Sequence, residues 1–183
     1  MGSSFRAVKP MIDIEIEEAA IFTRRMLRVE PKVRVAMVNL VETVLEELLP
    51  GYVFTVLPDD EMPGMDGFTG VGHYEICLSN STYEALNASD PDARFTVAHE
   101  LGHLILHSKR SSAMAKRIEY DRRVDPEWQA DCFADAWLMP YEGVLECSSV
   151  EEVVERFSVP EDAARRRFLQ VKDYPKIQGE LFE

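Results

Sequence analysis

The chain of 183 residues lacks the features that mark secreted and membrane-spanning proteins. Its three cysteines, Cys77, Cys132 and Cys147, form no Cys-x-x-Cys pair, which argues against a disulfide framework and a zinc ribbon. No apolar run approaches the roughly 20 residues needed to cross a bilayer. The first ten residues contain no apolar core that could serve as a secretion signal. We therefore expect free, mostly buried thiols in a cytoplasmic protein.

Positive charge is also scarce. Lysine and arginine number 20 against 33 acidic residues, which gives a formal net charge of −13. An acidic surface argues against a general nucleic-acid binder and against electrostatic attachment to anionic lipid. The hydrophobic fraction of 46% is high enough for a sizeable core. The length fits one domain, or one domain with a small appendage.

Histidine is rare, yet it is concentrated in one stretch. Three of the four histidines fall between positions 99 and 107. On a helix, His99 and His103 project from one face one turn apart, so two imidazoles can hold a single metal ion. Glu100 lies beside that face, where its carboxylate can reach a metal-bound water. This His-Glu-x-x-His pattern is the zinc metalloprotease signature, and we favour it over a helix that merely buries two histidines.

A catalytic zinc site needs a third protein ligand, and His107 is a poor candidate for it. It lies about 12 Å along the helix axis from His99, so three histidines cannot converge on one ion from an unbroken helix. The metzincin arrangement is also excluded, because Leu106 and Lys109 stand where that class has glycine and histidine. We expect His107 to cap carbonyl groups or to meet the negative end of the helix dipole.

The other common solution is an acid from a downstream helix, and Glu127 begins such a helix. Asp131 lies one turn later on the same side, where it could accept a hydrogen bond from a ligand imidazole and fix its tautomer. The alternative is that Glu127 only favours the helix N-terminus and that Asp131 is solvated. Four other carboxylates compete for the third position: Glu119, Asp121, Asp125 and Asp135.

These residues predict metal-assisted hydrolysis of a peptide bond. Zinc bound by His99, His103 and Glu127 would lower the pKa of its bound water, and Glu100 would act as general base. Manganese is an alternative metal, since a site of two histidines and a glutamate accepts both. An additional donor for the oxyanion is expected, and its three candidates are Tyr120, Tyr141 and His73.

Hydrophobic periodicity and helix-capping residues outline the secondary structure. Helices are predicted at 14–28, 31–49, 91–107, 127–139, 150–157 and 161–171, and strands at 52–57 and 70–78. The alternation at 12–16 is also compatible with a short strand. A loop is predicted at 58–70, an exposed connection at 109–124 and a tail over the last dozen residues. If the strand at 70–78 lies at a sheet edge beside the site, it could bind an extended peptide.

Two blocks of the sequence resemble the ImmA/IrrE metallopeptidases. The first is Arg94-Phe-Thr-Val-Ala-His-Glu-Leu-Gly-His-Leu-Ile-Leu-His107, and the second is Glu127-Trp-Gln-Ala-Asp-Cys-Phe-Ala-Asp-Ala-Trp-Leu-Met-Pro140. The resemblance implies His99, His103 and Glu127 as metal ligands and Glu100 as the base. It departs from the family at Asp131, where asparagine is usual.

The resemblance also implies an overall architecture, a partner and a location. It predicts an α+β, mostly helical zincin-like fold with a mixed or antiparallel sheet of about three strands on the His-Glu-x-x-His helix. Members of the family are typically intracellular and inactivate a helix-turn-helix repressor, here expected to be of the XRE type. The expected division is a disordered or tag-like start at 1–10, a metallopeptidase domain at 11–149, a packed helical pair at 150–172 and a tail at 173–183.

Two rival functions come from other classes. The helical pair carries Arg165, Arg166 and Arg167, and as a helix-turn-helix it could contact DNA. The alternative is a pair packed on the peptidase domain, with these arginines paired to Glu151, Glu152, Glu155, Glu161 and Asp162. Because the chain is acidic, nucleic acid is the less favoured partner. The other rival is a regulator that binds metal without catalysis and only sequesters a partner.

Overall fold

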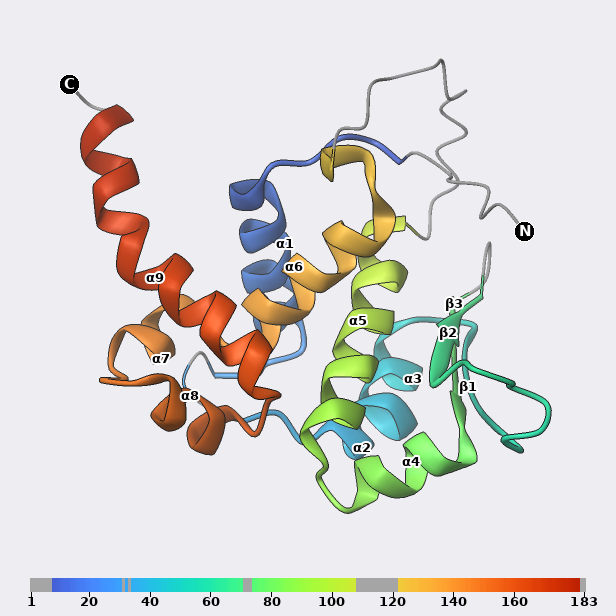
Figure 1. Cartoon of the computed structure of the whole chain (residues 1–183). Helices are drawn as coiled ribbons and strands as arrows, with labels where there is room; N and C mark the ends of the chain where they lie inside the picture. Colours follow the sequence, from blue (N-terminus) through green and yellow to red (C-terminus); the bar gives the residue numbers. More distant parts are fainter. Residues whose placement is uncertain (1–7, 31, 33, 71–73, 108–121, 182–183) are drawn as a thin grey trace.

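The computed structural model describes residues 8–30, 32, 34–70, 74–107 and 122–181. These residues form a mostly helical fold with one small mixed sheet, as Figure 1 shows, which confirms the predicted α+β class. The helix that carries the His-Glu-x-x-His pattern, α5 (Pro91–His107), runs through the middle of the molecule between the sheet and α6 (Pro126–Leu138). No helix within the described ranges is long and apolar enough to cross a membrane.

The sheet consists of three strands in the order β1-β3-β2, namely β1 (Tyr52–Leu57), β3 (Tyr74–Ser79) and β2 (Gly67–Thr69). β1 runs parallel to β3, and β2 pairs with β3 in antiparallel register. The predicted strand at 52–57 is confirmed, and the one at 70–78 is confirmed from Tyr74 onwards, with 71–73 outside the described residues. The predicted loop at 58–70 is wrong at its end, where β2 forms. The condition for peptide binding by the strand at 70–78, a place at the sheet edge, is not met. β3 is the central strand, and β2 is the edge nearest α5.

Helices α5 and α6 begin at Pro91 and Pro126, close to the predicted starts at 91 and 127, and each follows an aspartate. Asp90 Oδ1 accepts hydrogen bonds from the backbone N–H groups of Asp92 and Ala93, each at 3.0 Å. Asp125 Oδ1 accepts one from the N–H of Glu127 at 3.0 Å. Aspartate at this position satisfies N–H groups that have no partner within the helix. The two caps therefore fix where each site helix starts.

The N-terminal helices differ from the prediction in their boundaries. α1 (Asp13–Met26) is a helix and not a strand at 12–16, because Ile16 and Ala20 turn inwards one helical turn apart. The helix expected from Pro31 begins instead at Met37. It consists of α2 (Met37–Asn39), a π-helical stretch η1 (Leu40–Val44) and α3 (Leu45–Leu48). Pro31 itself lies outside the described residues.

Two short helices and one extension were not predicted. α4 (Asn80–Asn87) follows β3 directly, and the Ser79 side chain accepts the Thr82 N–H at its start. α7 (Tyr141–Leu145) follows Pro140. α8 (Val150–Phe157) matches the prediction, whereas α9 (Glu161–Leu181) continues through the residues predicted as a tail. A 3-10 turn, η2 (Arg122–Val124), precedes α6.

Two buried arginines tie the C-terminal helices to the rest of the fold. Arg94 on α5, only 3% exposed, donates to the carbonyl groups of Val35, Phe157 and Ser158 at 2.9 to 3.2 Å. Arg167 on α9 forms a bidentate pair with Glu17 of α1, at 2.7 and 2.6 Å, and is 2% exposed. Helices α8 and α9 are therefore packed on α1 and on the start of α5.

Candidate metal centre

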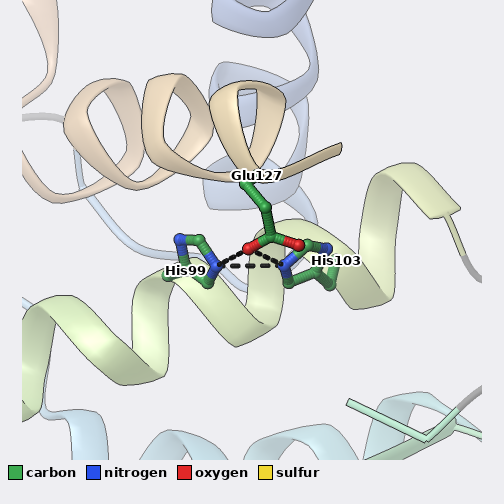
Figure 2. Close-up of side chains that lie close together, drawn as sticks. All are labelled: His99, His103 and Glu127. Atoms are coloured by element: carbon green, nitrogen blue, oxygen red, sulfur yellow. Dashed lines mark hydrogen bonds and ion pairs between the residues drawn. The ribbon is translucent and has the colours of Figure 1, made fainter. Parts of the chain in front are cut away.

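Three side chains that the sequence proposed as metal ligands converge in the structure. His99 and His103 project from α5, and Glu127 reaches towards them from the first turn of α6 (Figure 2). The two Nε2 atoms are 3.0 Å apart. The Glu127 Oε2 atom lies 3.2 Å from Nε2 of His99 and 3.4 Å from Nε2 of His103. One nitrogen or oxygen atom from each residue thus meets at a common point.

These separations fit a transition-metal ion. Ligand bonds of about 2.0 to 2.2 Å in a tetrahedral site place neighbouring ligand atoms about 3.3 to 3.5 Å apart. The three observed distances, 3.0, 3.2 and 3.4 Å, are close to that spacing. Two imidazoles and one carboxylate form a donor set that suits zinc or manganese. The Glu127 side chain is 68% exposed, so the centre opens to solvent on one side.

Asp131 lies behind the imidazole of His99, on the side away from the common point. Its Oδ1 atom is 2.8 Å from Nδ1 of His99. A carboxylate is an acceptor, so Nδ1 donates the hydrogen bond, and in the neutral imidazole Nε2 then presents a lone pair towards the common point. Asp131 stands one helical turn after Glu127 on α6, which brings both carboxylates to the face that meets α5.

The pKa values of the two histidines are shifted in opposite directions. Burial lowers the pKa of His99, but the hydrogen bond and charge of Asp131, with the charges of Glu100 and Glu127, outweigh burial and raise the pKa overall. Burial lowers the pKa of His103 to about 4, and the neighbouring His99 adds to this effect. His103 is therefore neutral near pH 7, which is the form that binds a metal ion.

Close approach of the two helices brings these residues together. Gly102 on α5 faces Ala130 and Phe133 on α6. A Cβ atom at Gly102 would lie 3.1 Å from Cα and 3.2 Å from the carbonyl oxygen of Ala130, and 3.2 Å from a ring carbon of Phe133. The missing side chain thus lets the backbones pack against each other, and Glu127 can reach the two histidines.

Glu100, the predicted general base, points to the sheet side of α5. It is 7% exposed, and its Oε2 atom accepts a hydrogen bond from the Thr69 hydroxyl at 2.7 Å. Burial raises the pKa of Glu100, while the Thr69 hydrogen bond and the charge of His99 oppose this effect. No sequence pattern singles out Thr69, because it is far from Glu100 along the chain and lies in the short, unpredicted strand β2.

His107 is not part of the converging set. Its ring centroid is 5.5 Å from that of His103, and burial is the main reason that its pKa is lowered. Backbone groups of Pro126 and Leu106 oppose this lowering of the pKa. Its Nε2 atom is buried without a hydrogen-bond partner among the described residues, so the carbonyl-capping role stays a prediction. Of the other carboxylates considered, Asp125 caps α6 and Asp135 pairs with Arg166.

The candidates for the oxyanion donor lie either away from this centre or outside the described residues. Tyr141 lines a cavity of about 190 Å³ between α1, α7 and α9, among residues such as Glu17 and Arg167. The other oxyanion candidates, His73 and Tyr120, lie outside the described residues, as do the competing carboxylates Glu119 and Asp121.

The three arginines of α9 are already paired within the chain. Arg165 pairs with Glu161 at 2.5 Å, and Arg167 pairs with Glu17. Arg166 pairs with Asp162 at 3.0 Å and with Asp135 of α6 at 3.2 Å. Pairing to Glu161 and Asp162 was expected, whereas Asp135 and Glu17 are partners that only the tertiary fold brings close. The arrangement favours a packed helical pair over a DNA-reading surface.

Comparison with known proteins agrees with this site. A search of curated proteins gives no match. The family profile of the M78 peptidases, described as the IrrE N-terminal-like domain, matches residues 66–169, which span β2, both site helices and most of the C-terminal pair. The family implies a bound metal, and the converging histidines and glutamate are the group that could hold it. The chain therefore belongs to the IrrE N-terminal-like family of M78 metallopeptidases.

Proposed function

We propose that this protein is a cytoplasmic, metal-dependent endopeptidase whose metal is held by His99, His103 and Glu127. The observation that carries the proposal is the convergence of three ligand atoms within 4.8 Å of one another. Beside them, Glu100 occupies the position of the base in the His-Glu-x-x-His pattern. Zinc is the metal that we favour, and manganese is the alternative.

Each protein group then has a role in peptide hydrolysis. A bound metal would supply a water of lowered pKa and a Lewis acid for the peptide carbonyl. Glu100 accepts the proton of the attacking water and delivers it to the leaving amine. Its burial favours the protonated form that this second step needs. Asp131 keeps the proton of His99 on Nδ1, so that Nε2 remains a ligand.

The edge strand β2 offers a way to bind the substrate. Among the described residues it pairs only with β3, so its other side presents unpaired backbone groups next to α5. An extended peptide can add to such an edge through main-chain hydrogen bonds. This would bring a peptide bond beside Glu100, since the Thr69 side chain of β2 contacts that residue.

The proposed substrate is an XRE-type helix-turn-helix repressor encoded near the gene of this protein. Support for this partner comes from the resemblance to ImmA/IrrE metallopeptidases, whose members inactivate such repressors. The paired arginines of α9 give no support to a direct role in DNA binding. Cleavage or sequestration of the repressor are the two ways in which the protein could act on it.

Co-expression with the neighbouring repressor tests the proposal. Wild type and Glu100→Gln should contain equal amounts of metal, and only wild type should cleave the repressor, because the variant keeps every ligand but lacks a base. Glu127→Ala should lose its metal and its activity, whereas Glu155→Gln, an exposed acid on α8, should retain both.

Three outcomes would count against parts of the proposal. Metal in the wild-type protein without cleavage of the repressor or of dye-labelled casein would favour sequestration. Full metal content and activity in Glu127→Ala would show that the third ligand is another residue. Cleavage by Glu100→Gln at the wild-type rate would remove Glu100 from the mechanism.

A further inference from the structure

The carboxylate of Glu100 is held against the sheet by a contact that the His-Glu-x-x-His pattern does not contain. The Thr69 hydroxyl lies 2.7 Å from Oε2 and 2.8 Å from the main-chain carbonyl oxygen of Glu100. A hydroxyl group has one hydrogen, so this donation is shared between the two oxygens. Hydrogen bonds to a carboxylate are stronger than those between neutral groups, which favours the side-chain oxygen.

The backbone of β2 also packs against the side chain of Glu100. A Cβ atom at Gly67 would come within 3.4 Å of Cγ of Glu100, so the strand packs directly against the stem of the glutamate. Gly67 and Thr69 share one face of β2, because side chains two residues apart in a strand point the same way. Glu100 is therefore confined by packing at its stem and by a hydrogen bond at its tip.

We propose that Thr69 is a positioning residue for Glu100, which it holds by one carboxylate oxygen so that the other is free to accept a proton. This inference rests on the proposed peptidase function. A buried carboxylate needs partners, and Thr69 is the side chain seen to hydrogen-bond it in the described part of the protein. Since β2 is also the proposed substrate-binding edge, one hydroxyl links the position of the peptide to that of the base.

Variants at Thr69 separate positioning from packing. Thr69→Val keeps the shape and removes the hydroxyl, whereas Thr69→Ser keeps the hydroxyl. With a fluorogenic peptide spanning the repressor bond cleaved by wild type, Thr69→Val should lower kcat about 10- to 100-fold and leave KM within about twofold. Thr69→Ser should stay within about threefold of wild type. Thr55→Val, in strand β1 at the far edge of the sheet, is the matched control and should change neither constant.

A second measurement needs neither metal nor substrate. In the metal-free protein, the unfolding equilibrium constants of wild type, Thr69→Val, Glu100→Ala and the double variant form a thermodynamic cycle. The effect of the double substitution on the unfolding equilibrium constant should differ about tenfold from the product of the two single effects, because each single substitution already removes the same hydrogen bond. Metal content should be equal in wild type and Thr69→Val, since neither oxygen in the contact belongs to the ligand set.

The outcomes distinguish this inference from the proposed function. Three results would each overturn the role of Thr69 and leave the peptidase assignment intact. They are a wild-type kcat in Thr69→Val, a kcat in Thr69→Ser as low as that of Thr69→Val, and a double variant whose unfolding constant equals the product of the single effects. If wild type cleaves neither the repressor nor casein, the peptidase assignment fails and catalytic positioning fails with it. The cycle then still reports whether the two side chains interact.

Discussion

The Nδ1 atom of His99 and the Oδ1 atom of Asp131 lie 2.8 Å apart, and this contact decides which nitrogen of the imidazole faces the metal centre. Asp131 comes from the same helix as Glu127, so α6 supplies both an expected ligand and a group that would orient another expected ligand. The resemblance to ImmA/IrrE metallopeptidases leads us to expect asparagine at this position. An amide oxygen could accept the same hydrogen bond, but it would not bring the negative charge that helps to raise the pKa of His99.

We expect Asp131→Ala to lower zinc affinity about 10- to 100-fold, because partners of this kind orient the ligand and increase its basicity. Asp131→Asn should lose less, since it retains an acceptor oxygen. Competition with a chromophoric chelator at fixed pH measures both values. Asp162→Ala removes an exposed aspartate from α9 and serves as the control. Equal affinity in Asp131→Ala and wild type would contradict the assigned role.

Gly102→Ala should force α5 and α6 apart. Alanine would favour the helix by up to about 1 kcal/mol, but its Cβ would meet the Ala130 backbone at 3.1 and 3.2 Å. Backbone atoms within a helix cannot turn aside as a flexible side chain can, and overpacking of this kind costs about 1 to 3 kcal/mol. The cost of crowding therefore exceeds the gain in helix propensity. Urea denaturation should show a net loss of stability, and chelator competition should show weaker zinc binding. Increased stability with unchanged zinc affinity would show that α5 and α6 accommodate the added methyl group without strain.

Asp135 should make the protein less stable as the pH rises. Burial raises its pKa from 3.8 to about 6, while Arg166 and Arg167 oppose burial and Asp131 adds to it. Between these two values the folded state binds more protons than the unfolded state, so stability falls as pH increases through this window. Over the whole titration, the contribution of Asp135 to the free energy of unfolding falls by about 3 kcal/mol.

The variant Asp135→Asn lacks this titration and provides the comparison. Between pH 4.5 and 7.5, its free energy of unfolding should improve relative to wild type by about 2 kcal/mol. Metal-free protein is required, because metal binding has its own pH dependence. Parallel stability profiles for the two proteins would mean that Asp135 titrates near its ordinary pKa.

The pair Glu17–Arg167 should contribute far more to folding than the pair Glu161–Arg165. Arg167 is 2% exposed, so Glu17→Ala leaves a buried charge without its partner and should cost about 3 to 5 kcal/mol. Adding Arg167→Met should recover most of that loss. Arg165 and Glu161 are exposed, and Glu161→Ala should cost less than about 1 kcal/mol by urea denaturation. Similar losses for both pairs would argue against tight docking of α9 on α1.

The parts of the structure that depend on spacing along one helix could be predicted from the sequence. The one-turn separation of His99 and His103 predicted that these two imidazoles converge, and the helix that begins near Glu127 made this residue the favoured third ligand over four other carboxylates. The structure brings the three side chains together. β2 was missed because three residues are too few to show an alternating pattern. α4 was missed because its polar residues favour loops as well as helices.

Contacts between distant segments could not be predicted in the same way. Thr69 meets Glu100, and Asp135 meets Arg166, only because the fold brings β2 to α5 and α9 to α6. Nothing in the residue types specifies these partners. A buried acid predicts that a partner exists, and the tertiary structure decides which one it is.

The hydrogen bonds of Arg94 bear on how short the protein could be made. Two of the three carbonyl groups that surround its guanidinium, those of Phe157 and Ser158, come from the junction of α8 and α9. A chain ending at residue 149 would leave this cation at the first turn of the histidine-bearing helix without most of its acceptors. We therefore expect the predicted domain at 11–149 to fail as an autonomous folding unit, and the C-terminal pair to be required for a soluble, metal-binding fragment.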